Sequence, residues 1–135
     1  MILGVLKETK AHENRVALTP TAVKTLCGKG YSCIIQNGAG EASSFSDTDY
    51  TDAGARMVSS ADGVVKEAAV ILKINPPDST ELGLLSNGKT WISLLQHRIN
   101  GELISQIAAK GATAISMDAI PRISRAQSMD VFSSQ

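Results

Sequence analysis

Short apolar runs separated by helical patterns constrain the fold of this chain more than any other feature. Five runs have the residue types of β-strands and stay apolar along most of their length, instead of alternating apolar and polar residues. Such runs are typical of parallel strands that are covered on both faces. The expected strands are Ile2–Leu6, Ser32–Gln36, Val70–Ile74, Thr90–Leu95 and Ala112–Met117.

Helical patterns occupy the segments between these runs. The first helix is expected to begin at Thr19-Pro20, an N-cap residue followed by proline at the first helical position, and to end at Gly28. The alternation predicts an α/β fold with an open, mostly parallel sheet and helices on both faces, a Rossmann-like or flavodoxin-like half-domain. The other expected helices are Ser46–Ala53, Ser60–Ala68 and Asn100–Lys110.

Composition excludes several classes of protein. The 135 residues suit one domain, and thirteen basic residues balance thirteen acidic ones, so we expect no broad attraction to nucleic acid. No stretch reaches the ~20 apolar residues of a membrane span, and the N-terminal run is too short for a signal peptide. We therefore expect no direct membrane insertion and a cytoplasmic location.

Neither the cysteines nor the glycines predict a ligand site. Cys27 and Cys33 have no histidine or further cysteine at ligand spacing, so we interpret them as small core residues and expect no metal. Segment 38–43 (GAGEAS) follows a predicted strand, but Ser43 stands where a dinucleotide-binding loop has its third glycine. A tight turn is the favoured interpretation of this segment.

Arg15, Lys73 and Gln96 form a possible anion or substrate-type site. Lys73 and Gln96, like Arg122, lie at or just beyond the ends of predicted strands, and Arg15 belongs to a polar cluster soon after the first strand. Ligands of open α/β sheets bind beyond the carboxyl ends of the strands. Arg15 could clamp a carboxylate, or it could form an ion pair with Glu8 or Glu13. Lys73 could extend its ammonium group to solvent or hold a ligand anion. The sequence leaves both pairs of alternatives open.

The last fifteen residues form the second candidate site. They contain two arginines, two glutamines, an aspartate and four serines, soon after a predicted strand. Arginine, glutamine and aspartate are costly to bury unless they are paired. A loop that binds a polar ligand or a partner needs this mixture of donors and acceptors.

Four segments carry a resemblance to a known family: 4–9 (GVLKET), 13–20 (ENRVALTP), 71–77 (ILKINPP) and 117–130 (MDAIPRISRAQSMD). They resemble the N-terminal part of the alanine dehydrogenase and nicotinamide nucleotide transhydrogenase family. The most specific segment, 117–130, is similar to the loop of the proton-translocating transhydrogenase alpha subunit that approaches the nicotinamide of NAD(H). The resemblance implies hydride transfer between NAD(H) on this component and NADP(H) on another, coupled to proton movement.

The resemblance also implies roles for residues. It divides the chain into an α/β domain, residues 1–120, and a nicotinamide-contacting loop with the start of a helix or linker, residues 121–135. The residues that would contact NAD(H) are Arg122, Gln127, Asp130 and Ser133. In similar alanine dehydrogenases Arg15 and Lys73 would hold the substrate, but the catalytic histidine of those enzymes falls on Gln96, with His97 one place late. This departure favours a transhydrogenase.

Partners follow from the same resemblance. They are an NADP(H)-binding component and a membrane proton-channel component, through which the protein would lie at the cytoplasmic face of the inner membrane. The family continues into a second, NAD-binding Rossmann half, so we expect this chain to be a piece that is inactive alone. We expect it to be monomeric or weakly associating, and the complete component to be a homodimer. The alternatives are an alanine dehydrogenase-like oxidoreductase fragment and a non-catalytic assembly module.

Overall fold

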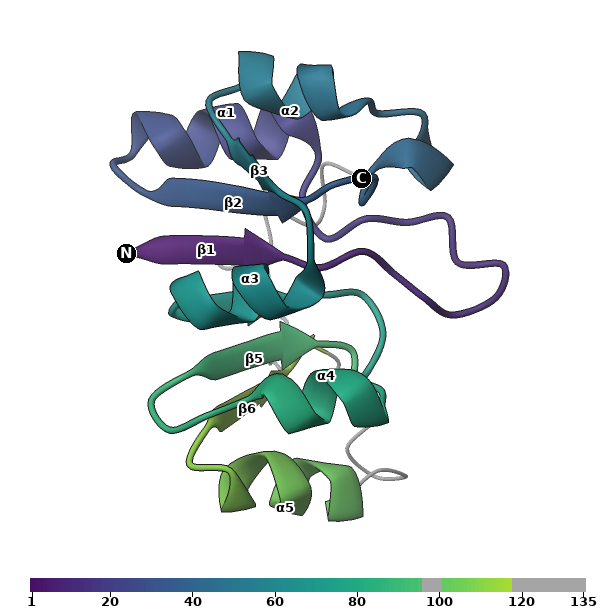
Figure 1. Ribbon diagram of the computed structural model, residues 1–135, viewed down its shortest axis with the longest axis vertical. Helices are drawn as coiled ribbons and strands as arrows, with labels where there is room; N and C mark the ends of the chain where they lie inside the picture. Colours follow the sequence, from purple (N-terminus) through teal and green to yellow (C-terminus); the bar gives the residue numbers. More distant parts are fainter. Residues whose placement is uncertain (96–100, 118–135) are drawn as a thin grey trace.

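The computed structural model describes residues 1–95 and 101–117, and it contains one open sheet whose strand pairs are all parallel. The strand order is β3-β2-β1-β4-β5-β6 (Figure 1). All five predicted strands are confirmed: one has the predicted bounds, and the other four are one or two residues shorter than expected. The strands are β1 (Ile2–Val5), β2 (Ser32–Gln36), β3 (Arg56–Val58), β4 (Val70–Leu72), β5 (Thr90–Ser93) and β6 (Thr113–Ser116).

The predicted helices are also present, and the structure contains two further elements that the sequence did not predict. The first addition is strand β3, and the second is helix α4, which begins two residues after the prolines at positions 76 and 77. Residue 100, the expected start of the last helix, lies outside the described residues. The helices are α1 (Pro20–Gly28), α2 (Asp47–Asp52), α3 (Ala61–Glu67), α4 (Ser79–Leu84) and α5 (Gly101–Ala109), with a short 3₁₀ helix at Glu41–Ser43.

Helix α1 begins as the sequence predicts. Thr19 has an extended backbone, and its side chain accepts a hydrogen bond from the Ala22 amide at 3.1 Å. Pro20 occupies the first helical position, where its missing N–H costs nothing because that position has no acceptor inside the helix. The helix ends at Gly28, and Gly30 takes a positive φ of 95° as the chain turns into β2. The turn places α1 directly beside the strand that follows it.

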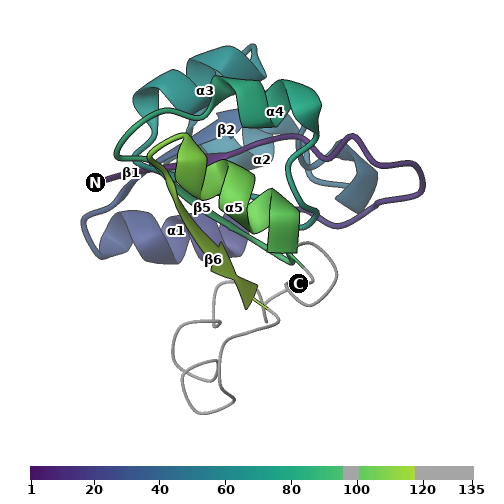
Figure 2. The ribbon, with the colours of Figure 1, turned by 90° about the horizontal axis from the view of Figure 1, so that it is seen from below.

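Helices cover both faces of the sheet (Figure 2). An apolar layer lies between the helices and the sheet on each face. Helices α1 and α2 contribute Val23 and Tyr50 to one layer, which also includes Val5 and Ile35. Helices α3, α4 and α5 pack on the other face around the fully buried Trp91. Its indole N–H donates to the Ser93 hydroxyl at 2.9 Å, so Trp91 packs in the core with its polar group hydrogen-bonded.

The direction in which strands are added reverses at β1. The chain places β2 and β3 on one side of β1, and then returns to place β4, β5 and β6 on the other. Such a reversal leaves a crevice outside the carboxyl ends of the two central strands, which is where open α/β sheets bind ligands. Here the two strands are β1 and β4, so the fold directs attention to the residues that follow Val5 and Leu72.

No helix in the described ranges is both long and apolar enough to cross a lipid bilayer.

Candidate functional site

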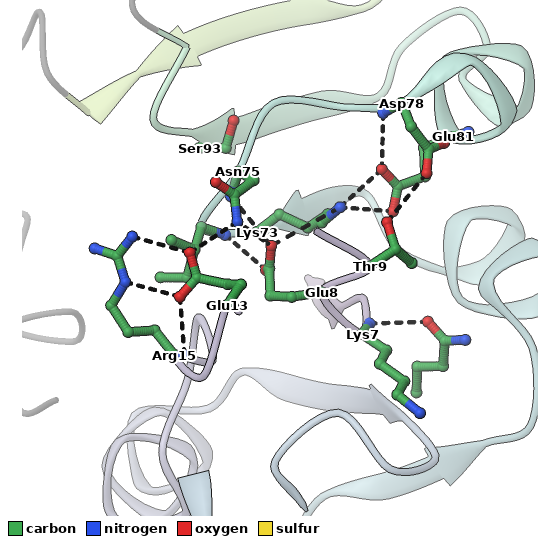
Figure 3. Close-up of polar contacts among 12 residues, drawn as sticks. Lys7, Glu8, Thr9, Glu13, Arg15, Lys73, Asn75, Asp78, Glu81 and Ser93 are labelled. Atoms are coloured by element: carbon green, nitrogen blue, oxygen red, sulfur yellow. Dashed lines mark hydrogen bonds and ion pairs between the residues drawn. The ribbon is translucent and has the colours of Figure 1, made fainter. Parts of the chain in front are cut away.

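The residues that follow β1 and β4 form a connected polar network at the reversal point of the sheet (Figure 3). Lys73, the residue after β4, lies at its centre with only 1% of its surface exposed. Its ammonium nitrogen is 2.8 Å from both carboxylate oxygens of Glu81 and 3.9 Å from Oε1 of Glu8. The partners of this buried cation are therefore carboxylates of the chain itself, and the side chain does not extend to solvent.

Helix α4 holds Glu81 in place through a capping box. The Asp78 side chain accepts from the Glu81 amide at 2.8 Å, and the Asp78 amide donates to Oε1 of Glu81 at 3.0 Å. Thr9, from the loop after β1, donates its hydroxyl to Asp78 at 3.2 Å. Burial raises the pKa of Glu81 above its usual range, against the opposing effect of Lys73. Glu81 thus joins the start of α4 to the buried lysine.

Glu8 connects the ends of β1 and β4 through hydrogen bonds. Its carboxylate accepts hydrogen bonds from the Ile74 amide at 2.8 Å and from the Asn75 amide at 3.2 Å, across 66 and 67 residues of sequence. The Asn75 side-chain amide donates to the same carboxylate at 3.2 Å. Glu8 therefore satisfies two backbone groups that the end of the parallel ladder leaves without a strand partner.

Arg15 forms the intramolecular ion pair with Glu13 that was one of its two predicted environments. Its Nε and Nη2 atoms donate to the two oxygens of Glu13 at 2.9 and 3.0 Å, and its backbone amide donates at 3.0 Å. Asn75 adds a hydrogen bond to Glu13 at 2.9 Å. The hydrogen bonds from Arg15 lower the pKa of Glu13 from 4.5 to about 2, and the same contact raises the pKa of Arg15.

Both cations of this network are already paired with carboxylates of the chain. Two cations, Arg15 and Lys73, face the three carboxylates of Glu8, Glu13 and Glu81. An incoming anion would have to compete with Glu81 for the buried ammonium group of Lys73. The guanidinium group of Arg15 is more accessible, because its side chain is 57% exposed and it binds Glu13 through Nε and Nη2. In the described ranges no cluster of His, Cys, Asp or Glu side chains could hold a metal ion. The network is thus suited to fixing the geometry of the strand ends, and an anion reaches the buried Lys73 only by displacing a carboxylate.

The glycine segment after β2 forms a turn, as the sequence favours. Gly38 has a φ of 79°, and its amide donates to the Asp47 carboxylate at 2.9 Å. A 3₁₀ helix of three residues, Glu41–Ser43, follows instead of a long helix. An amide already bound to a carboxylate is not available to a phosphate oxygen, so the segment lacks the geometry of a dinucleotide loop.

Several predicted site residues lie outside the described residues. These are Gln96 of the possible anion site and all four residues predicted to contact NAD(H), namely Arg122, Gln127, Asp130 and Ser133. Their roles stay predictions. Sequence reasoning also missed Glu81, whose signal was the spacing of an aspartate and a glutamate three residues apart at a helix start.

A comparison with known protein families identifies the family of this chain. Residues 4–135 match the family described as "Alanine dehydrogenase/PNT, N-terminal domain". The chain belongs to this family. The match spans nearly all of the sequence, so both the described residues and residues 118–135 fall inside it.

Within this family the chain is similar to transhydrogenase subunits over nearly its whole length. It is 40% identical over 134 residues to the NAD(P) transhydrogenase subunit alpha of Cereibacter sphaeroides, which covers 99% of the chain and 26% of that subunit. It is 36% identical over 134 residues to the NAD(P) transhydrogenase subunit alpha of Haemophilus influenzae, again covering 99% of the chain and 26% of the relative. An alanine dehydrogenase of Halomonas elongata is 38% identical over 89% of the chain and 32% of its own length.

Solved structures confirm the Rossmann-like fold. The crystal structure of the Sinorhizobium meliloti transhydrogenase matches with a TM-score of 0.87 and 40% identity, over 99% of this chain and 40% of that one. An L-alanine dehydrogenase matches with a TM-score of 0.82 and 34% identity, over 87% of this chain and 32% of the enzyme. The chain thus spans between about a quarter and two fifths of the proteins it matches here.

Proposed function

We propose that this chain is the N-terminal portion of the NAD(H)-binding component of a proton-translocating transhydrogenase. The observation that carries the proposal is the extent of the similarity. Two proteins named as transhydrogenase alpha subunits match 99% of the chain, whereas an alanine dehydrogenase of comparable identity matches 89%. The reaction proposed is hydride transfer between NAD(H) on this component and NADP(H) on a partner, coupled to proton movement through a membrane component.

The topology of the sheet supports a site at the edge where β1 and β4 end. All six strands are parallel, so their carboxyl ends meet at one edge, which also carries Glu8 and Lys73. Strand β6 ends there at Ser116, and the loop sequence that begins at position 118 follows it directly in the chain. The polar network fixes the geometry of the edge from which the candidate loop departs.

The chemistry of the four candidate residues suits a nicotinamide carboxamide. A carboxamide has one acceptor oxygen and two donor hydrogens. Arg122 and Gln127 can donate to the oxygen, and Asp130 can accept from the nitrogen, with Ser133 able to do either. Fixing the rotation of the ring decides which face presents its hydride, and holds C4 near its acceptor.

The proposal also covers the partners, the location and the oligomeric state of the protein. NAD(H) would bind with the help of a second, NAD-binding half of the component, and NADP(H) would bind to a partner component. The protein would lie at the cytoplasmic face of the inner membrane through its partners, as a homodimer when complete. Because half of the cofactor site is supplied elsewhere, these 135 residues alone would be inactive.

Alanine dehydrogenase-like chemistry is the second candidate, and one observation favours it. Asn75 connects Glu13, the partner of Arg15, to Glu8, which lies beside Lys73. An amino or oxo acid bound there would exchange with the carboxylates that now hold the two cations. Pyruvate binding that is lost in both Arg15→Ala and Lys73→Ala would support this function, and a non-catalytic assembly module would bind neither pyruvate nor NADH.

The test of the proposed site is Arg122→Ala in the protein at its full natural length. With the NADP(H)-binding component present, we expect the variant to transfer hydride from NADH to NADP⁺ at least about tenfold more slowly, with unchanged thermal unfolding. The matched control is Arg56→Ala, which removes an arginine from a surface ion pair with Glu67 on β3 and α3. A rate in Arg122→Ala equal to that of the control would remove Arg122 from the site.

A further inference from the structure

The connection between β1 and α1 is long for an α/β fold. It runs from Leu6 to Thr19, because β1 ends at Val5 and α1 begins at Pro20. Such connections commonly have roughly 2–6 residues, and longer loops without helices or strands are often functional. In Figure 1 this segment extends beyond the arrowhead of β1 before it returns to α1. The loop therefore projects from the edge of the sheet where the strands end.

Hydrogen bonds hold both arms of this loop against the rest of the fold. On the outgoing arm, the Thr9 hydroxyl donates to Asp78, the N-cap residue of α4, at 3.2 Å. On the returning arm, the Asn14 carbonyl accepts from the hydroxyl of Ser43, in the 3₁₀ helix after β2. The arms are thus bound to two separate parts of the fold, and they present residues 10–12 between them at the tip.

The tip of the loop is a tight turn with exposed polar side chains. The Glu13 amide donates to the Lys10 carbonyl at 3.2 Å, and His12 has a φ of 66°. This left-handed conformation is uncommon for residues other than glycine, and such positions concentrate at functional sites. Lys10 and His12 are both exposed, and in the described ranges neither side chain has a hydrogen bond or an ion pair. Both donors are therefore available to a partner.

The charged residues of the loop are sorted by sign between the fold and the solvent. The side chains of Glu8 and Glu13 turn inward, with 3% and 9% of their surface exposed. The basic residues Lys7, Lys10 and Arg15 are exposed. The outer surface of the loop is therefore cationic, although the chain as a whole has no net charge.

The proposed hydride transfer brings a partner to the same edge of the sheet. Hydride passes between two nicotinamide rings when the reacting atoms are about 3–3.5 Å apart. In the proposed function NAD(H) lies at the edge where β1 and β4 end, so the NADP(H)-binding component has to approach that edge. A loop that projects from the edge lies in the path of this approach.

We propose that residues 7–15 form a docking element for the NADP(H)-binding component, and that the surface they meet carries carboxylates. The inference rests on the proposed function, because that function supplies the partner. The anchored arms reduce the entropy lost when the loop is bound. Lys10 and His12 can donate to carboxylate oxygens. The exposed cations speed association with an acidic surface and favour its correct orientation.

The test measures the affinity of the protein at its full natural length for the NADP(H)-binding component, without NADH or NADP⁺. Lys10→Glu reverses a charge at the tip and should weaken the complex at least about fivefold in about 0.1 M salt. The loss should shrink in about 1 M salt, where the screening length falls from about 10 Å to about 3 Å. The matched control is Lys29→Glu, an exposed lysine between α1 and the start of β2, at the opposite edge of the sheet. It should leave the affinity unchanged.

A second variant separates the effect of charge from any distortion of the loop. Ala11 is exposed, and Ala11→Lys adds a cation to the tip, so it should tighten the complex about twofold to threefold in low salt. A distorted loop would not bind more tightly.

Equal affinities of Lys10→Glu and Lys29→Glu would overturn the proposal. So would a Lys10→Glu variant that keeps its affinity for the component and loses binding to vesicles containing phosphatidylglycerol, because the loop would then contact the membrane surface. The affinities are measured without turnover. Absence of hydride transfer in the unaltered pair would therefore refute the proposed function, whereas the binding of the variants decides the docking element separately.

Discussion

Breaking the buried pair of Lys73 and Glu81 by removing one partner should strongly destabilise this domain. Glu81→Gln keeps the volume of the side chain but leaves a lysine with 1% of its surface exposed without its closest counter-charge. Removing one partner of a buried pair costs about 3–5 kcal/mol. Glu8, at 3.9 Å, still attracts Lys73 by about 4 kcal/mol at an effective dielectric constant of roughly 20. We therefore expect the lower end of the range, about 3 kcal/mol.

Urea unfolding measures this loss. With a slope of about 2 kcal/mol per molar urea, typical of small domains, the midpoint should fall by about 1.5 M. The matched control is Glu67→Gln, the same substitution in the exposed pair with Arg56, which should cost less than about 1 kcal/mol. The reasoning also predicts that Lys73→Met restores much of the stability lost in Glu81→Gln, because no unpaired charge then stays buried.

Two results would refute this reasoning. The first is a Glu81→Gln variant no less stable than Glu67→Gln, which would mean that the buried pair contributes as little as an exposed one. The second is simple additivity of Lys73→Met and Glu81→Gln, since a coupled buried pair should show an interaction free energy of about 2 kcal/mol. Either outcome would mean that water or Glu8 compensates Lys73 fully.

Two further predictions concern acid stability and packing. Glu13, whose pKa falls from 4.5 to about 2 beside Arg15, should stabilise the fold fully above pH 4.5 and lose this contribution as the pH falls through about 2. Acid unfolding curves of the natural sequence and Glu13→Gln should therefore converge near pH 2, and a constant difference between them would contradict the assignment. Gly40→Ala would place a methyl group 2.6 Å from Cε2 of the buried Tyr50 and should cost about 1–3 kcal/mol in thermal or urea unfolding. Gly83→Ala, within a helix and with no atom within 4 Å, should instead stabilise the protein by about 0.5–1 kcal/mol, and equal effects of the two would refute the packing argument.

The sequence predicts the strands of this fold better than its short elements. Continuous apolar runs identify five strands, because burial on both faces leaves a clear pattern. Strand β3 has three residues, one of them the exposed Arg56, so it has too few apolar positions to show a period. Helix α4 has six residues and follows two prolines, which mark a loop more strongly than its capping box marks a helix.

The sequence predicts where the candidate site lies, but it does not predict which of its residues bind each other. The sequence places Lys73 at a strand end and Arg15 in a polar segment after the first strand, and the fold brings both to the edge where β1 and β4 finish. It does not reveal that Glu8 binds the amides of residues 74 and 75, because that contact joins segments 66 and 67 residues apart. Pairing across such distances depends on strand order, which a local pattern does not contain.

The central claim is that this chain serves hydride transfer to NADP⁺ and not the interconversion of pyruvate and alanine. The most direct measurement supplies the protein at its full natural length, with the NADP(H)-binding component, with NADH and either NADP⁺ or pyruvate and ammonium. We predict formation of NADPH and no alanine. Alanine formed at the expense of NADH, without any NADPH, would contradict the account and identify the network around Arg15 and Lys73 as a substrate site.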